Sequence, residues 1–306
     1  MVGAERCSIC QEPAVIRWRG QPERLCAGHL AARLEEMVRH HIRKNSLLSP
    51  GDHVAVALSG GKDSTALLLI LAGLLPEWKE VSITAITVDE GIAGYRDETI
   101  ESAARITRRL GIRHHLISFP EAFGADLDTL IRRSGSGARA CSICGVLRRK
   151  VLAEAADRIG ATRIATGHNL DDEAQSVLMN VLRGDLARLV QDSSSGEPRC
   201  FIPRIKPLAP ITEKEVVAYL FIRDSYVELP ECPYAGTALR SGIRSMLGPL
   251  EYRHPGTRER LMRSQAAIQE LHGPHVPSGV RRCGRCKNPC NGEICQACRI
   301  LGSLGF

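Results

Sequence analysis

Short apolar runs alternate with longer helical stretches through the middle of the chain. Four runs have the length of a strand: His53–Leu58, Val81–Val88, His114–Phe119 and Thr162–Thr166. Helical spacing predicts helices over Thr65–Leu75, Asp97–Leu110, Cys144–Ile159 and Asp171–Arg183. Repeated strand and helix units predict an α/β fold, with a parallel five-stranded sheet and helices on both faces.

The segments around this repeat predict a modular chain. We expect a linking helix over Leu30–Lys44, a helix from Thr212, and a helical region over about 236–272. The run Asp192–Pro198 reads as an exposed, mobile loop. The resulting units are an N-terminal metal module (1–30), the linking helix (31–50), the α/β domain (51–225), a helical extension (226–275) and a C-terminal metal module (276–306).

Composition excludes disorder and fibres, because 43% of the 306 residues are hydrophobic and 25% are charged. The longest apolar run, Ala66–Leu75, is too short for a bilayer, and the N-terminus resembles no leader, so we expect a soluble cytoplasmic protein without a membrane partner. The net charge is +7 and most basic residues are Arg. A nucleic-acid partner fits this charge, and so does a solvated basic surface with no specific partner.

Twelve cysteines in a chain of this kind favour metal sites over disulfides. Two complete quartets have the spacing of tetrahedral zinc: Cys7, Cys10, Cys26 and His29 at one end, and Cys283, Cys286, Cys295 and Cys298 at the other. The alternative is free reduced thiols. Two structural Zn²⁺ modules are the better interpretation, and they would present Arg17, Arg19, Arg281, Arg282 and Arg285 to RNA phosphates or serve a homodimer. Cys200 and Cys290 read as spare thiols.

The sequence Ser59-Gly60-Gly61-Lys62-Asp63-Ser64 lies where the first strand passes into a helix. Glycine amides and a helix N-terminus at this place favour a phosphate. Val56 and Asp63 depart from Walker A spacing, which disfavours an ordinary P-loop. Ser59–Ser64 instead resembles the PP-loop of the HUP-like ATP pyrophosphatases, which split ATP between its α and β phosphates. The resemblance implies that Ser59, Gly60, Gly61 and Ser64 cradle pyrophosphate, that Lys62 offsets its charge and that Asp63 helps to hold Mg²⁺.

Further polar residues follow the fourth strand. Gly167-His168-Asn169 precedes Asp171-Asp172-Glu173, and the carboxyl ends of parallel strands line a ligand crevice. The acids can also serve as simple caps of the next helix.

A third set of cysteines lies near the predicted sheet. Cys141 and Cys144 begin a helix whose dipole, with Arg148 and Arg149, would favour thiolates, and Cys232 is the best remaining third ligand. Three thiolates leave one iron of a 4Fe-4S cluster open. A redox disulfide between Cys141 and Cys144, or zinc completed by a further ligand, fits the same residues.

Several motifs together resemble the tRNA 2-thiouridine synthetases of the TtuA-like family. They are Ser59–Ser64, Asp89-Glu90-Gly91-Ile92, Gly94-Tyr95-Arg96, Cys141-x-x-Cys144-Gly145, Thr166-Gly167-His168-Asn169, Cys232 and the metal quartets at both ends. The resemblance implies a 4Fe-4S cluster on Cys141, Cys144 and Cys232, with Asp89, Gly167, His168 and Asp172 at the nucleotide. It also implies catalytic roles for Asp63 and Asp172, and a ubiquitin-like thiocarboxylate protein as sulfur donor.

One position departs from the family pattern. Some members use a catalytic lysine shortly after the Cys pair, where this chain has Arg148-Arg149-Lys150. Because Arg does not lose its proton at ordinary pH, Arg148 is expected to act electrostatically and not as a base.

The function expected from all these features is ATP-dependent adenylation of uridine O2 in tRNA, followed by replacement of that oxygen with sulfur. Two alternatives share some of the features. A tRNA cytidine thiolase or another PP-loop adenylating enzyme would keep Ser59–Ser64 but would not need both metal modules. A non-catalytic RNA-binding zinc protein would keep the modules but would have no use for Ser59–Ser64.

Overall fold

The computed structural model describes residues 5–19, 21–135, 137, 140–190, 201–235, 239–272 and 281–306. The expected loop Asp192–Pro198 and the thiol of Cys200 lie outside these residues. None of the helices in the described ranges is both long enough and apolar enough to cross a membrane.

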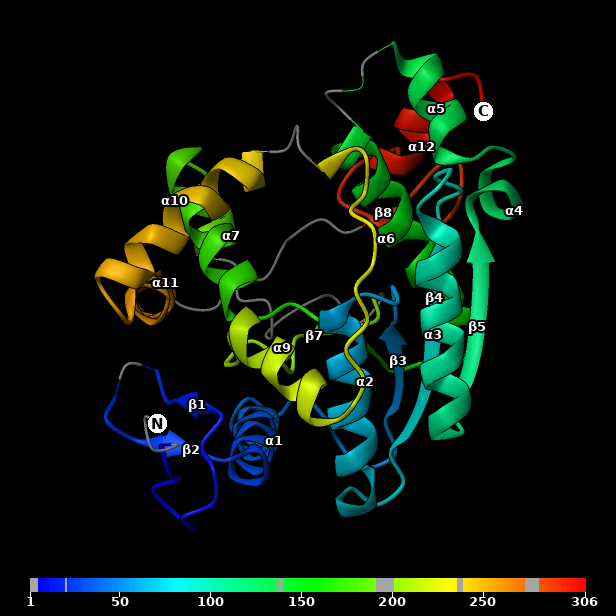
Figure 1. Ribbon diagram of the computed structural model, residues 1–306. Coiled ribbons are helices and arrows are strands. Elements are labelled where there is room, and N and C mark those ends of the chain that lie inside the picture. The colour runs from blue at the N-terminus through cyan, green and yellow to red at the C-terminus, as the bar shows by residue number, and fades with distance from the viewer. Residues whose placement is uncertain are drawn as a thin grey trace.

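A five-stranded parallel sheet forms the centre of the protein, in the order β5-β4-β3-β6-β7 (Figure 1). The strands are β3 (His53–Ala57), β4 (Ser82–Asp89), β5 (Arg113–Ser118), β6 (Arg163–Ala165) and β7 (Arg204–Ile205). The predicted parallel sheet is therefore confirmed, and four strands coincide with the four apolar runs. The short edge strand β7 had no apolar run to mark it, and it is held by pairing with β6.

Alternating side chains of the central strands pack into two separate apolar layers. Val54 and Val56 of β3 contribute to one layer, while Ala55, between them, contributes to the other. The first layer is covered by α1 (Ala27–Lys44), α2 (Lys62–Leu74), α3 (Arg96–Leu110) and α9 (Glu213–Ile222). The second is covered by α5 (Leu127–Ser134), α6 (Ala140–Arg158) and α12 (Gln296–Ser303). This confirms the expected helices on both faces.

Three helices stand beside the sheet, on the left in Figure 1. They are α7 (Leu170–Leu182), α10 (Leu239–Arg253) and α11 (Thr257–His272), the last two lying within the predicted helical region. Ala174, Ile243 and Leu247 form a small apolar cluster that joins α7 to α10. Shorter elements are η1 (Leu75–Glu77), α4 (Phe119–Phe123) and α8 (Leu186–Val190).

Each end of the chain folds into a small module around a two-stranded antiparallel ribbon. The ribbons are β1 (Ile16–Arg17) with β2 (Arg24–Leu25), and β8 (Arg281–Arg282) with β9 (Pro289–Cys290). Helix α1 begins three residues before the expected Leu30, because Cys26 caps it by accepting the amide hydrogen of His29. The metal module and the linking helix are therefore continuous. Helix α12 packs against α6, so the C-terminal module lies on the catalytic domain.

Candidate active site and metal centres

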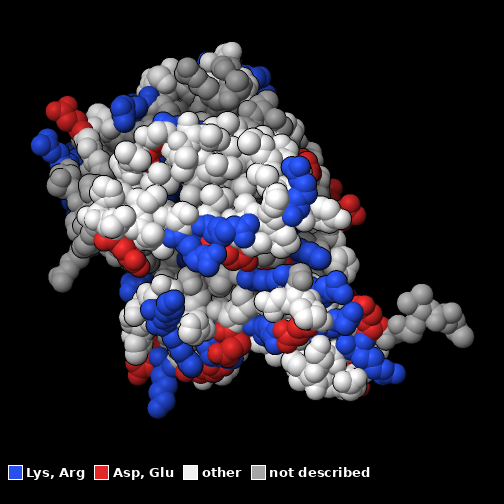
Figure 2. Space-filling model, turned by 90° about the vertical axis from the view of Figure 1, so that its left-hand side faces the viewer, with Lys and Arg blue, Asp and Glu red and all other residues white. Residues whose placement is uncertain are grey.

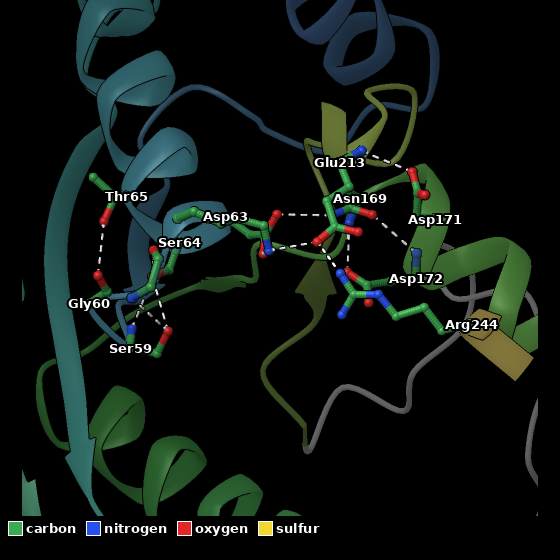
Figure 3. Close-up of polar contacts among 12 residues, drawn as sticks. Ser59, Gly60, Asp63, Ser64, Thr65, Asn169, Asp171, Asp172, Glu213 and Arg244 are labelled. Atoms are coloured by element: carbon green, nitrogen blue, oxygen red, sulfur yellow. Dashed lines mark hydrogen bonds and ion pairs between the residues drawn. The ribbon is translucent and has the colours of Figure 1, made fainter. Parts of the chain in front are cut away.

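The glycine loop turns sharply between β3 and α2. Gly60 has φ +86°, and a Cβ atom there would lie 1.9 Å from the carbonyl oxygen of Thr99, so only glycine fits. The amide of Ser59 donates to Oγ of Ser64 at 3.1 Å, and the two hydroxyls are also 3.1 Å apart (Figure 3). The loop is therefore held closed by its own serines.

The N-terminus of α2 is open toward this loop. Its N-cap is Gly61, which has no side chain to satisfy the first amides of the helix. Gly167 packs against the start of the helix, where a Cβ atom would lie 2.9 Å from the amide nitrogen of Ser64. Unsatisfied amides at a helix N-terminus are a phosphate site. The loops after β3 and β6 thus lie against each other at the carboxyl ends of the two strands, which is where the sequence predicts a ligand crevice between Ser59–Ser64 and Gly167.

Asn169 links two carboxylates from different elements across the crevice. Asp63 Oδ1 accepts a hydrogen bond from Asn169 Nδ2 at 2.8 Å, and Asn169 forms a reciprocal capping box with Asp172 (Figure 3). The capping interpretation of these acids is therefore correct for Asp172, and the same geometry brings it to Asp63. Elsewhere in the crevice, burial lowers the pKa of His168, and its Nδ1 lies 2.9 Å from the hydroxyl of Thr166.

This carboxylate pair does not by itself form a metal cage. Among the described residues, three or more ligand atoms come within 4.8 Å of one another only in the two terminal quartets. A Mg²⁺ ion here would take most of its ligands from phosphates and water, which is how that ion usually binds nucleotides.

The sequence analysis missed a set of charged residues that closes the crevice from the other side. Lys62 Nζ lies 2.9 Å from both Asp63 and Glu213, and Glu213 also contacts Arg244 of α10. Burial lowers the pKa of Lys62, but these carboxylates outweigh it and the net pKa is raised. Arg240 of α10 contacts Asp172 at 3.2 Å. The first turn of the helix expected at Thr212 was the available pointer to Glu213.

The two cysteines of α6 lie in its first turns, and burial dominates their chemistry. It raises the pKa of both thiols, although Arg148 acts in the opposite direction. Burial thus opposes the effect that the helix dipole and the arginines are expected to have on these thiols. Cys141 Sγ contacts the carbonyl oxygen of Tyr234 at 3.1 Å.

Cys232 joins the pair from a distant part of the chain. It packs against the apolar cluster that contains Cys144, and Cys141 contacts the carbonyl oxygen of Tyr234, two residues after Cys232, so the three cysteines lie together. All three are free thiols, so the alternative of a Cys141–Cys144 disulfide is not what the structure contains. At least one pair of their sulfur atoms is more than 4.8 Å apart, while a single zinc ion holds thiolates roughly 4 Å apart. Three soft donors at wider spacing suit an iron–sulfur cluster better than one zinc.

A buried chain of charges connects the cysteines to the glycine loop. Arg148 donates to Cys144 Sγ at 3.2 Å and pairs with Glu90 Oε1 at 3.0 Å. Glu90 Oε2 lies 2.9 Å from Arg96, whose guanidinium also donates to the carbonyl oxygen of Ser59 at 3.4 Å. The glycine loop and the three cysteines thus belong to one site. Arg148 is placed for the expected electrostatic role, and Asp89 binds the amide of Gly91 at 2.8 Å.

The N-terminal quartet is assembled as predicted. All four ligand atoms of Cys7, Cys10, Cys26 and His29 lie within 4.8 Å of one another. Burial raises the pKa of Cys7, but backbone amides outweigh it and lower the value to about 6. The set has the donors and the spacing of a closed tetrahedral metal site.

The C-terminal quartet of Cys283, Cys286, Cys295 and Cys298 meets the same criterion. Backbone amides of Cys295 and Cys286 lower the pKa of Cys283 to about 5. Cys290 is outside the quartet and contacts the carbonyl oxygen of Gly292, in agreement with a spare thiol.

Two arginines expected to face RNA are instead internal connectors. Arg19 pairs with Glu215 of α9 at 2.8 Å, and Arg285 donates to the carbonyl oxygens of Cys298 and Phe306. Arg19 therefore ties the N-terminal module to α9, whereas the contacts of Arg285 stay within the C-terminal module. Arg17, Arg281 and Arg282 are exposed, as expected.

Comparison with known proteins assigns this arrangement to a family. Residues 29–247 match the PP-loop domain family. The tRNA 2-thiolation protein NcsA of Haloferax volcanii is 36% identical over 97% of this chain and 98% of its own length. The chain belongs to the PP-loop family of tRNA 2-thiolation proteins. Cytoplasmic tRNA 2-thiolation protein 1 of Bos taurus is 36% identical over 98% of this chain and 88% of its own length.

A solved member of this PP-loop family has the same fold. The U34-tRNA thiolase NcsA from Methanococcus maripaludis with its 4Fe-4S cluster matches at a TM-score of 0.83 and 30% identity, covering 100% of this chain and 98% of that one. The resemblance drawn from the motifs is therefore confirmed. The roles assigned to individual site residues stay predictions.

Proposed function

We propose that this protein is an ATP-dependent tRNA thiolase of the cytoplasm that converts a uridine to 2-thiouridine. The observation that carries the proposal is the continuous path from Ser59 through Arg96, Glu90 and Arg148 to Cys144, which joins a phosphate-binding loop to a cysteine trio in one crevice. The named activity of the relatives supports it, and the solved thiolase supports position 34, the wobble uridine, as target.

The first half of the reaction is adenylation. Uridine O2 attacks the α-phosphorus of ATP, the bond from that phosphorus to pyrophosphate breaks, and the uridine N3 proton is released. The open amides at Gly61 and the ammonium of Lys62 are placed to stabilise charge on the departing pyrophosphate. Asp63 and Asp172 would hold Mg²⁺ together with the phosphates.

The second half is sulfur transfer. Sulfur at the oxidation level of hydrosulfide adds to C2, the C2–O bond breaks and AMP leaves with the oxygen, so no oxidant is needed. A 4Fe-4S cluster on Cys141, Cys144 and Cys232 would supply an open iron that holds the sulfur. Arg148 contributes a fixed positive charge next to Cys144, and its contact with Glu90 holds that charge in place.

The remaining components follow from the donor sets and the family. Both terminal quartets would hold structural Zn²⁺, which leaves no open position for catalysis. A ubiquitin-like thiocarboxylate protein is the proposed sulfur donor. The terminal modules would form the contacts of a homodimer.

Anaerobic purification and nucleoside analysis test the proposal. About four irons, four sulfides and two zincs per chain are expected after reconstitution. Incubation with ATP, sulfide and unmodified tRNA should produce 2-thiouridine, and the C232S variant should lose iron and activity but keep zinc, whereas C290S should keep all three. Formation of 2-thiocytidine, or zinc without iron, would contradict the proposal.

A further inference from the structure

A wide groove runs between the N-terminal module, α1 and α11, on the opposite face of the sheet from the cysteine helix α6. Its volume is about 1080 Å³, and it is lined by Trp18 of the N-terminal module, by Arg33, His40, His41 and Lys44 of α1, and by Arg263 of α11. Figure 2 views this side of the molecule and shows Lys and Arg gathered in a band across its middle, between an upper and a lower part.

The groove keeps positive charges that no carboxylate of its lining neutralises. Its two carboxylates are already paired, Glu23 with Arg33 at 2.5 Å and Glu36 with Arg39 of the same helix. Within the described ranges, no acceptor contacts the side chain of Lys44 or of Arg263, and both side chains are exposed. Two unpaired cations therefore stand on facing walls, one on α1 and one on α11.

The wall formed by the N-terminal module is fixed in place. The guanidinium of Arg19 bridges Glu215 of α9 at 2.8 Å, Glu259 of α11 at 3.2 Å and the carbonyl oxygen of Pro210 at 2.7 Å. Trp18 lies between the guanidinium groups of Arg19 and Arg33, each 5.1 Å from its ring. The groove thus exists before any ligand arrives, which lowers the entropic cost of binding.

The helix that forms one wall also reaches the catalytic crevice. Arg258, in the first turn of α11, pairs with Asp171 at 2.8 Å, and Asp171 is next to Asp172. Arg263 lies five residues farther along the same helix, roughly 7.5 Å at the rise of an α-helix. Helix α11 therefore carries one arginine to the Asp171–Asp172 end of the crevice and another to the groove.

We propose that this groove binds the sugar–phosphate backbone of the tRNA substrate, with Lys44 and Arg263 contacting phosphates from opposite walls. The proposal rests on the tRNA thiolase function proposed above and specifies where the RNA lies. Unpaired cations on both walls of an open groove suit a chain that carries a charge at every nucleotide. A sulfur-carrier protein is the less suitable occupant, because one folded domain does not offer the regular row of negative charges that cations on both walls of a groove would bind.

Charge reversal tests this proposal directly. K44E/R263E is compared with the wild type and with K79E/R105E, which makes the same change in net charge at two exposed cations that have no contact in the described structure. Binding of unmodified tRNA is measured over a range of salt concentrations. K44E/R263E should bind at least about tenfold more weakly at low salt, with the slope of log K against log salt reduced by about one for each cation. K79E/R105E should bind nearly as the wild type.

Other readouts separate the causes of failure. ATP binding, zinc content and the thermal midpoint should be unchanged in K44E/R263E, and K44Q/R263Q should show an intermediate loss of tRNA affinity. Wild-type tRNA affinity in K44E/R263E, an equal loss in K79E/R105E, or a selective loss of carrier-protein binding would overturn the proposal. If the wild type itself neither binds nor thiolates tRNA, the proposed function fails, whereas wild-type binding with an inert groove refutes only this inference.

Discussion

Replacing Glu90 by Gln tests whether the buried charge chain stabilises the protein and sets the position of Arg148. Glu90 and Arg96 are 3% and 4% exposed, so the substitution leaves the Arg96 guanidinium buried with a weakened partner. Removing one member of a buried ion pair costs about 3–5 kcal/mol. We expect the lower end, about 3 kcal/mol, because Arg148 is half-exposed and Asp89 remains 3.9 Å from Arg96.

For a chain of this size that loss lowers the thermal midpoint by roughly 6 °C. Differential scanning calorimetry of the metal-loaded protein measures it. The matched control is E98Q on α3, an exposed carboxylate whose replacement should change stability by less than about 0.5 kcal/mol. A double-mutant cycle of E90Q with R148M should show coupling, and thiolation should fall in E90Q more than folded protein is lost. Equal midpoints for E90Q and E98Q would refute the reasoning.

Three further changes test other parts of the site. G60A places a methyl group 1.9 Å from a backbone oxygen at φ +86°, so it should abolish ATP binding in a nucleotide titration, whereas G73A, in an open position of α2, should bind normally and gain up to about 1 kcal/mol. Burial raises the pKa of Glu213, but Lys62 and Arg244 outweigh it, so the pKa in the folded protein lies below the ordinary 4.5. The ionised Glu213 therefore stabilises the folded protein above pH 4.5, and this contribution is lost as the pH falls through the pKa of the folded state. E213Q should therefore show a flatter decline of stability below pH 4.5 in acid unfolding curves, and an unchanged slope would contradict the ion pairs. C283S should lose one metal ion per chain and expose the α12–α6 contact to hydrogen exchange, while C290S should do neither; identical exchange in both would show that the module needs no metal.

Most of the sheet could be predicted from the sequence, because strands that are buried on both faces appear as continuous runs of apolar residues. The runs His53–Leu58 and Val81–Val88 supply alternate residues to two apolar layers, and such strands need β-branched and apolar side chains throughout. Strand β7 has no such apolar run, since it is two residues long and is defined by its pairing with β6. The metal quartets were predictable for a related reason, because a tetrahedral site requires four soft donors and short spacings within each pair.

The parts of the site that escaped prediction are contacts between elements far apart in the chain. Glu213 reads locally as a first-turn acid of α9, and only the tertiary fold brings it to Lys62. Arg19 is a basic residue in a metal module, which suggested an RNA contact, but it is bound by Glu215, about two hundred residues later in the sequence. Cys141 and Cys144 lie where a helix dipole favours thiolates, yet burial raises their pKa values.

These misses have a common physical origin, which also bears on how the site works. Three charged groups near the crevice have a counter-charge from another element: Lys62 from α9, Asp172 from α10 and Asp171 from α11. A nucleotide and its Mg²⁺ would compete for these same groups, since phosphate attracts Lys62 and the cation attracts Asp172. These half-buried ion pairs join the crevice to α9, α10 and α11, and their exchange for phosphate and Mg²⁺ would link nucleotide binding to the helices α10 and α11. Because α11 also carries Arg263, the same helix would connect the nucleotide crevice to the groove proposed for RNA.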